Sequence, residues 1–177
     1  MEKGIVIKST GSWYLVKRTN GEIIEARIRG KLRTKGLRTT NPVAVGDIVS
    51  LEKNEDNFVI TEIGERRNYI IRKSTNLSKE AHIIASNVDQ TLLIATINHP
   101  VTSAVFIDRI LATTEAYNIP AILVFNKSDL YDNTDREKAT ELITIYSEIG
   151  YRCLQVSAVT GQNITELREL LKDKVTV

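Results

Sequence analysis

Short runs in which apolar and polar residues alternate fill the first part of the chain and predict β-strands. Five such runs, rich in β-branched and aromatic residues, occupy positions 4–8, 13–17, 23–28, 47–52 and 58–63. Asn20-Gly21 separates the second run from the third and is a strong hairpin signal, because both residues tolerate positive φ. Five short strands with one long connection favour a small oligonucleotide-binding (OB) barrel, although a five-stranded SH3-like barrel would give much the same pattern.

From about residue 80 the pattern changes to alternating strands and helices. Nearly continuous apolar runs at 88–97 and 121–125 predict strands that are buried on both faces of a parallel sheet, and 152–156 predicts a third. A further strand is expected to begin at 174–177. This order predicts an open α/β sheet with right-handed crossovers.

Helical spacing of apolar residues predicts the intervening helices. Capping-box spacing is expected to start the second and third helices, at Thr134/Glu137 and Asn163/Glu166, and Gly150 is expected to end the second. The residues expected to face the core are Phe106, Ile107, Ile110, Leu111, Thr114 and Tyr117 in the first helix, Ala139, Leu142, Ile143, Tyr146 and Ile149 in the second, and Ile164, Leu167 and Leu170 in the third.

Composition narrows the class of protein. The 177 residues are 42% hydrophobic and 26% charged, which is typical of a soluble globular chain. No apolar run reaches the roughly 18 residues of a membrane span, and the charged N-terminus lacks a signal-peptide pattern. Cys153 is the only cysteine and the two histidines lie far apart, so we expect no disulfide and no metal site in this chain. These features predict a cytoplasmic protein.

Charge is distributed unevenly along the chain. Residues 1–73 carry 15 Lys/Arg and 9 Asp/Glu, a net charge of +6, whereas residues 74–177 carry 9 and 13, a net charge of −4. The difference predicts two domains, 1–73 and 74–177, of which the first binds an anionic partner.

The long connection after the third predicted strand is rich in cations and has no acid between Glu25 and Asp47. It could be a solvated loop, but uncompensated cations favour contact with RNA phosphates. A second basic group follows the barrel. Trp13 and Tyr14 could stack on bases, although at least one of them is expected in the core. The predicted RNA-binding residues are Arg27, Arg29, Lys31, Arg33, Lys35, Arg38, Arg66 and Arg67.

Polar residues follow two of the predicted parallel strands, where ligands of open α/β sheets bind. Asn126-Lys127-Ser128-Asp129 follows one strand and Ser157-Ala158 follows the next. This set can bind guanine: the Asp129 carboxylate can accept hydrogen bonds from N1–H and N2–H₂, and a backbone N–H of the Ser157-Ala158 turn can donate to O6. Adenine would leave these groups unpaired.

Two further residues have predicted roles in that site. The Asn126 amide can orient the loop and approach the N7 and O6 edge, and the Lys127 stem can lie over the ring while its ammonium stays solvated. In the alternative interpretation, Asn126 and Asp129 merely start a turn.

NKxD followed by Ser-Ala resembles the fourth and fifth motifs of translation-factor-type GTPases. In ordinary members the phosphate-binding GxxxxGK[ST] loop precedes NKxD, but none of the 125 residues before Asn126 contains it. A basic barrel ahead of NKxD resembles the circularly permuted ribosome small subunit-dependent GTPase A family. Other stretches agree along almost the whole chain: RIRGKLR, VGDIV, RRNYIIRKS, NVDQTLLIAT, FIDRILATTEAY and VFNKSDL.

The resemblance implies a partial, circularly permuted P-loop GTPase-like domain after the OB barrel. It also implies a cytoplasmic GTPase that binds the small ribosomal subunit and its rRNA during late maturation, with GTP or GDP and Mg²⁺ as ligands. In that family the phosphate loop, the catalytic residue and a zinc-binding domain come after the segment that matches Val177. We therefore expect no catalytic residue in these 177 residues, no hydrolysis by them alone, and a monomer without membrane contact.

The alternative from another functional class is a non-enzymatic RNA-binding module whose α/β domain has lost nucleotide chemistry. An enzyme that uses Cys153 or the histidines has no partner residues at suitable spacing. Cys153 is expected in the core, His99 in a loop, and Asp108-Arg109 as a surface pair on a helix.

Overall fold

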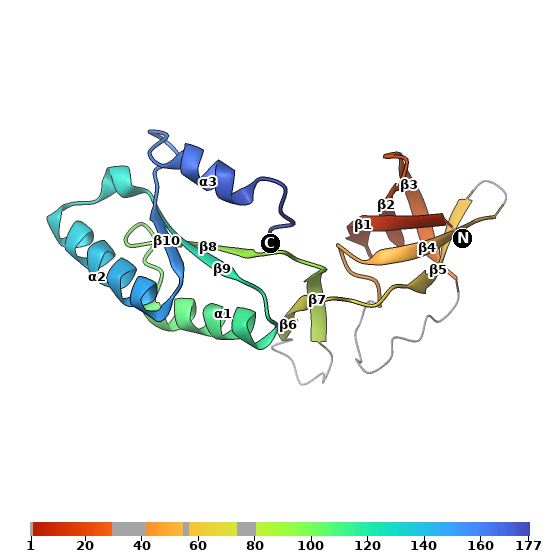
Figure 1. Ribbon diagram of the computed structural model, residues 1–177, viewed down its shortest axis with the longest axis horizontal. Coiled ribbons are helices and arrows are strands. Elements are labelled where there is room, and N and C mark those ends of the chain that lie inside the picture. Colours follow the sequence, from red (N-terminus) through yellow and green to blue (C-terminus); the bar gives the residue numbers. More distant parts are fainter. Residues whose placement is uncertain (1, 30–41, 55–56, 74–80) are drawn as a thin grey trace. The chain divides into compact units, whose positions relative to one another are not determined.

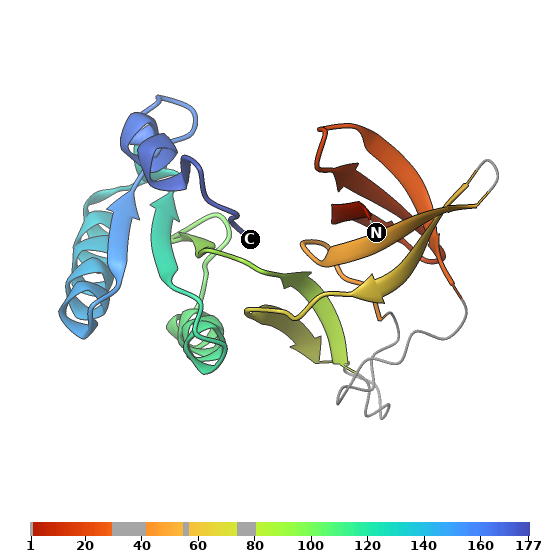
Figure 2. The ribbon, with the colours of Figure 1, turned by 45° about the vertical axis from the view of Figure 1, so that its right-hand side comes forward.

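The computed structural model describes residues 2–29, 42–54, 57–73 and 81–177. The chain divides into two compact units, Met1–Val88 and Asp89–Val177. The described part of the first unit contains only β-strands, whereas the second alternates strands with helices (Figures 1 and 2). The domain boundary after residue 73 stays a prediction from sequence.

Five strands of the first unit close into a barrel in the order β1-β2-β3-β5-β4. All neighbours run antiparallel except β3 and β5, which pair in parallel. This is an OB-like arrangement, and it confirms the predicted barrel class over the SH3-like alternative. The strands are β1 (Glu2–Thr10), β2 (Trp13–Arg18), β3 (Ile23–Ile28), β4 (Ile48–Asn54) and β5 (Asn57–Ile63).

Side chains alternate between the inside and the outside of the barrel, as the period of two requires. Tyr14 is 1% exposed and belongs to the core together with Val16 and Ala26, whereas Trp13 is only half-buried. One of the two aromatic residues is therefore a core residue, as expected.

A four-residue connection joins β2 to β3. Gly21 has a φ of 87°, while Asn20 keeps a negative φ and uses its side-chain oxygen to accept from the Glu22 N–H at 3.0 Å. The Asn-Gly hairpin signal is confirmed, but only the glycine needs the left-handed conformation.

A second hairpin, which the sequence did not predict, follows the barrel. It consists of β6 (Tyr69–Lys73) and β7 (Ala81–Ser86), paired antiparallel. Its strands are short, and the residues between them lie outside the described part of the chain. Arg72 and Lys73, noted in the sequence as part of a basic group, are the last residues of β6.

A buried ion pair anchors the segment before β4. The Asp47 side chain is fully buried, and Arg66 donates to its two carboxylate oxygens at 2.7 and 2.6 Å. The Ser86 hydroxyl and the Ala44 N–H also donate to this carboxylate, at 2.5 and 2.8 Å. The network therefore joins three segments that are distant in sequence: the turn before β4, the connection after β5 and the end of β7.

Three parallel strands form the sheet of the second unit, in the order β10-β9-β8. They are β8 (Thr91–Thr96), β9 (Ala121–Asn126) and β10 (Arg152–Gln155). The helices are α1 (Ala104–Ala116), α2 (Asn133–Ile149) and α3 (Ile164–Leu171), with a short 3₁₀ turn, η1 (Ser128–Leu130), after β9. The predicted α/β order is confirmed.

The last residues of the chain lie beside β8. Gln90 and Thr176 form a parallel bridge, and the Leu92 N–H donates to the Val177 carbonyl at 2.8 Å. The strand expected from residue 174 is thus present as a single bridge.

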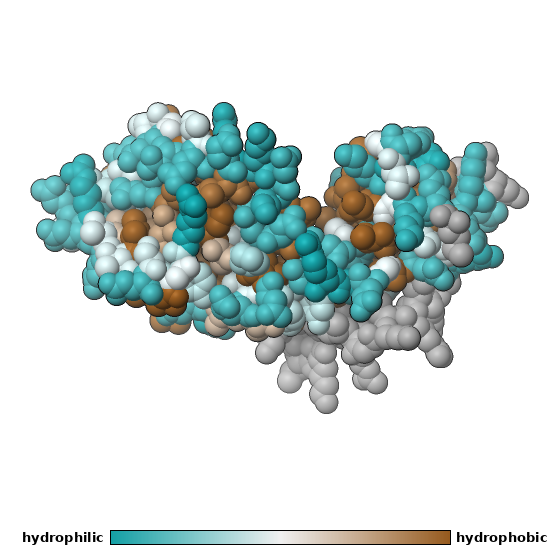
Figure 3. All heavy atoms as spheres, viewed as in Figure 1, coloured by the Kyte–Doolittle hydropathy of each residue, from teal (hydrophilic) through white to brown (hydrophobic). Residues whose placement is uncertain are grey.

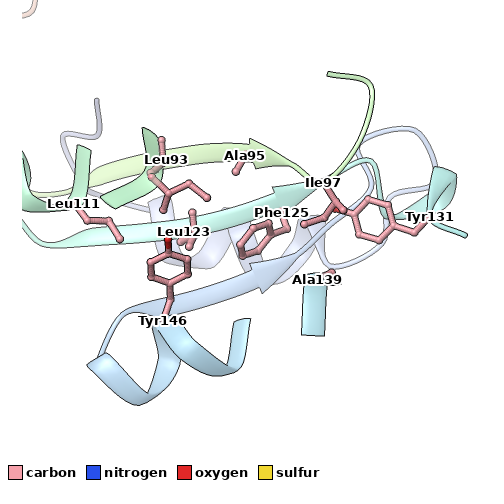
Figure 4. Packing of buried hydrophobic residues seen from close by; sticks show 10 residues of the cluster. Leu93, Ala95, Ile97, Leu111, Leu123, Phe125, Tyr131, Ala139 and Tyr146 are labelled. Atoms are coloured by element: carbon pink, nitrogen blue, oxygen red, sulfur yellow. The ribbon is translucent and has the colours of Figure 1, made fainter. Parts of the chain in front are cut away.

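Helices cover both faces of this sheet. On one face, Leu123 and Phe125 of β9 pack with Leu111 of α1 and Tyr146 of α2 (Figure 4). On the other face, Ile122 and Val124 of β9, Leu154 of β10 and Val156 just after β10 pack against Ile164, Leu167 and Leu170 of α3. Packing against two layers of helices explains why β9 is apolar throughout.

Strand β8 is less deeply buried than the sequence predicts. Ile94 is 57% exposed, so the strand is not buried on both faces. Brown spheres of hydrophobic residues reach the surface over this sheet between α1 and α3 (Figure 3). Phe106 and Ile149 were also expected to face inward, but they are 51% and 64% exposed, because each lies at the edge of its helix's apolar stripe.

Both predicted capping boxes are wrong. Helix α2 is capped by Asp132, whose carboxylate accepts from the Asp135 N–H at 2.8 Å, and not by Thr134. Asn163 precedes α3 in the left-handed conformation, and its side chain donates to the Gln155 carbonyl instead of capping the helix. Gly150 ends α2 with a φ of 110°, as predicted. None of the described helices is long and apolar enough to cross a membrane.

Candidate functional site

The two polar segments singled out in the sequence meet at one edge of the α/β sheet. Gln155 of β10 lies in parallel register with Phe125 of β9, so the two strands end side by side. Asn126 is the last residue of β9 and Lys127–Asp129 follow it, while Ser157-Ala158 come one residue after the end of β10. The Ser128 N–H donates to the Val156 carbonyl at 3.1 Å, which holds the first segment against the second.

Two side-chain hydrogen bonds join the segments. The Ala158 N–H donates to the Asn126 side-chain oxygen at 3.2 Å, which links Asn126 to the turn that follows β10. The Ser157 hydroxyl donates to Asp129 Oδ1 at 2.5 Å. Ser157 is buried, whereas Asp129 and Ala158 are exposed. The site therefore has a buried hydrogen-bonded support beneath an accessible carboxylate.

Lys127 has the left-handed backbone conformation, with φ of 66° and ψ of 34°. Its exposed ammonium donates one hydrogen bond to the His99 carbonyl at 2.5 Å, and the expectation that this group stays solvated remains a prediction. His99 lies in the loop between β8 and α1, as expected. The contact brings a third strand-end loop to the site and fixes the course of the lysine stem.

Gln162 and Tyr131, which were not singled out in the sequence, support the site through hydrogen bonds. The Ser128 hydroxyl donates to the Gln162 side-chain oxygen at 2.9 Å, and the Ser157 N–H donates to the Gln162 carbonyl at 3.2 Å. The Tyr131 hydroxyl donates to the Asn126 carbonyl at 3.0 Å. No sequence signal marks Gln162, because its role arises only from the folded loop.

Burial of the Tyr131 ring raises the pKa of its phenol. A phenol is protonated at neutral pH in any case, and the raised pKa extends to higher pH the range in which the hydroxyl donates to the Asn126 carbonyl. Tyr131 also belongs to the hydrophobic cluster beneath the sheet edge (Figure 4), so it connects the site to the core.

The described residues hold no group of three or more His, Cys, Asp or Glu side chains that could bind a metal ion. Cys153 is a free, half-buried thiol within β10. Asp108, expected as a surface partner of Arg109, instead accepts a hydrogen bond from the Tyr146 hydroxyl at 2.8 Å.

The predicted RNA-binding residues have different environments. Arg27 is exposed and lies over the Trp13 ring, and the exposed Arg29 pairs with Glu52 at 2.7 Å. Arg66 is held by Asp47, and its side chain is only 12% exposed. Arg67 donates to the Asn87 carbonyl at 2.9 Å. The other four, Lys31, Arg33, Lys35 and Arg38, lie outside the described residues.

Comparison with known proteins accounts for both units. The family model described as RsgA GTPase matches residues 63–177, and the model of the RsgA N-terminal domain matches residues 3–59. The small ribosomal subunit biogenesis GTPase RsgA of Bacteroides fragilis is 52% identical over 176 residues, which are 99% of this chain and 57% of that protein. The protein of the same name from Flavobacterium psychrophilum is 52% identical over 178 residues, covering 98% and 55%.

Two solved structures share the fold. YjeQ from Thermotoga maritima superposes with a TM-score of 0.77 at 34% identity, over 99% of this chain and 58% of that one. YloQ, described as a circularly permuted GTPase, gives 0.72 at 28% identity, over 99% and 58%. The chain thus spans a little over half the length of these relatives. Because the family model matches more than half of the chain and the relatives are about half identical to it, the chain belongs to the RsgA GTPase family.

Proposed function

We propose that this chain supplies the guanine-recognising part and the RNA-binding barrel of a GTPase that acts in biogenesis of the small ribosomal subunit in the cytoplasm. One observation carries the nucleotide part of the proposal. The Asn126–Ala158 and Asp129–Ser157 hydrogen bonds unite the two polar segments at a single sheet edge and leave the Asp129 carboxylate accessible.

Guanine fits the hydrogen-bonding groups of this edge. One oxygen of Asp129 is held by Ser157, and a carboxylate retains further lone pairs for the N1–H and N2–H₂ donors of guanine. Adenine has no donor at its N1 position, so it would leave the carboxylate unpaired. The Ala158 N–H bonds to Asn126 at 3.2 Å, and guanine O6 would share that donor. The Lys127 stem, fixed at its end by His99, would cover one ring face.

Phosphoryl transfer requires a phosphate-binding loop and Mg²⁺, which position the phosphates and neutralise their charge. The sequence contains no GxxxxGK[ST] loop, and the described residues form no metal-ligand cluster. We therefore assign no catalytic step, no Mg²⁺ ligand and no zinc ligand to this chain. The 177 residues alone should bind GTP weakly and hydrolyse none. Phosphate release above background that Asp129→Ala abolishes would contradict this.

The barrel is proposed to bind RNA of the small ribosomal subunit. The excess of cations in residues 1–73 supports this, as does the accessibility of Arg27 and Arg29 on the barrel surface. The segment carrying Lys31, Arg33, Lys35 and Arg38 is proposed to contact phosphates, together with Arg67. Arg66 is proposed to contribute less directly, because its guanidinium is occupied by buried Asp47.

Titration of the labelled chain with nucleoside monophosphates, followed by NMR, tests the nucleotide proposal. Guanosine monophosphate should shift the amide signals of residues 126–129 and 157–159, and adenosine monophosphate at the same concentration should leave them unchanged. Asp129→Ala should abolish the guanosine response. Equal responses to both nucleotides, or shifts confined to other parts of the chain, would overturn the guanine assignment.

A further inference from the structure

We propose that Trp13 and Arg27 form a stacking site for an unpaired RNA base on the outer face of the barrel. This inference rests on the proposed RNA-binding function and adds to it a particular site and the part of the RNA that the site contacts. Its ligand class is single-stranded RNA, because a base must be free of its duplex stack to lie on a protein side chain.

The Trp13 and Arg27 side chains stack on one another. The guanidinium carbon of Arg27 lies 3.6 Å from the centroid of the Trp13 ring. Tyr14 pairs with Ala26 in the antiparallel register of β2 and β3, and both are buried. Trp13 and Arg27 are the neighbouring positions on the two strands, so their side chains lie on the outer face.

Arg27 differs from its neighbouring arginines in the partner of its charge. Arg18 pairs with Glu2 and Glu22, and Arg29 pairs with Glu52. Among the residues that the structure describes, Arg27 has no carboxylate partner; its contact is the Trp13 ring. A planar guanidinium that rests on an aromatic ring and keeps its charge can stack on a nucleobase and attract the adjoining phosphate.

Trp13 and Arg27 lie on β2 and β3 of the barrel. OB-type barrels bind oligonucleotides across the face of their second and third strands, which are the two strands that carry this pair. After Arg29 the chain continues into the segment of Lys31, Arg33, Lys35 and Arg38. The stacking pair therefore lies on the strands that barrels of this class use to bind oligonucleotides, and the sequence that follows supplies cations that attract phosphates.

Trp13 is the only tryptophan of the chain, so its fluorescence reports on this site alone. We would titrate the 177-residue chain with a single-stranded oligouridylate and, in parallel, with an abasic oligonucleotide of the same length. The oligouridylate should quench Trp13, because its bases can stack. The abasic oligonucleotide should bind through its phosphates with little quenching.

Arg27→Lys preserves the charge and removes the planar guanidinium. It should weaken oligouridylate binding about fivefold or more and leave the slope of log affinity against log salt unchanged. Arg109→Lys, the same change at an exposed position of α1 outside the barrel, is the matched control. It should leave both the affinity and the quenching close to those of the parent chain.

Three outcomes would overturn the stacking site: equal quenching by the two oligonucleotides, no change of Trp13 fluorescence on binding, or equal affinities of Arg27→Lys and the parent. In each of these cases salt-dependent RNA binding would still stand, as measured by an independent method such as fluorescence anisotropy of a labelled oligonucleotide. A chain that binds neither oligonucleotide at low salt would refute the RNA-binding function itself, and the stacking site with it.

Discussion

Four hydrogen-bond donors surround the carboxylate of Asp47: two nitrogens of Arg66, the Ser86 hydroxyl and the Ala44 N–H. A charged side chain can be buried when hydrogen-bond donors surround it in this way. Without such partners, burial of the charge would cost a large amount of folding free energy. The exposed pair of Arg29 and Glu52 is the natural contrast, since water already solvates both of its partners.

Asp47→Asn should therefore destabilise the barrel unit by about 3–5 kcal/mol, because Arg66 keeps its charge and loses its partner. Glu52→Gln, the same chemical change at an exposed pair, should cost less than about 1 kcal/mol. Chemical denaturation followed by Trp13 fluorescence measures both, because Trp13 lies in the barrel. Equal costs for the two variants would show that the buried network does not anchor the unit.

Burial raises the pKa of the Cys153 thiol, and a hydrogen bond with Ser147 offsets this only in part. Since the thiolate is the reactive form, a raised pKa leaves less of it at neutral pH. Iodoacetamide should therefore alkylate Cys153 more slowly in the folded chain than in denaturant at the same pH. Mass spectrometry over time measures the rates; equal rates would contradict the assignment of Cys153 to the core.

At the scale of secondary structure, Gly46 lies in the turn before β4, where it packs against the end of β7. Its φ is 91°, and an added Cβ would lie 2.0 Å from the Ser86 carbonyl oxygen. Gly21, in the turn between β2 and β3, has a φ of 87° and open space around it. The two glycines share a backbone conformation and differ in the room available for a side chain.

Gly21→Ala should cost about 1 kcal/mol of barrel stability, which is the strain of a left-handed alanine. Gly46→Ala should cost about 1–3 kcal/mol more, because the backbone of β7 has to move away from the new methyl group. Denaturation curves read by Trp13 fluorescence compare them directly. A Gly46→Ala variant as stable as Gly21→Ala would mean that β7 does not pack closely on this turn.

Most of the elements could be predicted from sequence, because the periods of barrel strands and of parallel strands are strong local signals. The meeting of Asn126–Asp129 with Ser157-Ala158 was also predictable, since neighbouring parallel strands end at the same edge. The support from Gln162 and from the His99 carbonyl was not, because these contacts depend on loop conformation. The β6–β7 hairpin was missed because its strands are short and Arg72-Lys73 suggested only a basic group.

Tertiary packing explains the remaining errors. Phe106 and Ile149 fit the helical period, but the face that a helix buries is set by the sheet beneath it. Asp132 and Thr134 are both good N-cap residues, and local sequence does not determine which one begins α2.

At the scale of the whole molecule, the two halves of the chain carry opposite net charges. This predicts that residues 1–73, the positively charged half, bind RNA. Arg33→Glu with Lys35→Glu should weaken RNA binding and reduce the salt slope by about 1.4, the value for two lost phosphate contacts on a single strand. Lys172→Glu with Lys174→Glu makes the same charge change at exposed positions of the second unit. This control should leave the slope unchanged; equal effects of the two double variants would contradict a specific basic segment.

The nucleotide preference of Asp129→Asn tests the central claim most directly. Xanthine carries a carbonyl where guanine carries the N2 amino group, so an asparagine amide can donate to it and still accept from N1–H. The variant should lose affinity for guanosine monophosphate and gain affinity for xanthosine monophosphate, each about tenfold or more. Asp132→Asn, which removes the same charge and keeps an N-cap residue for α2, should retain the parent's preference for guanosine. An Asp129→Asn chain that binds guanosine as the parent does, or gains no affinity for xanthosine, would contradict the account.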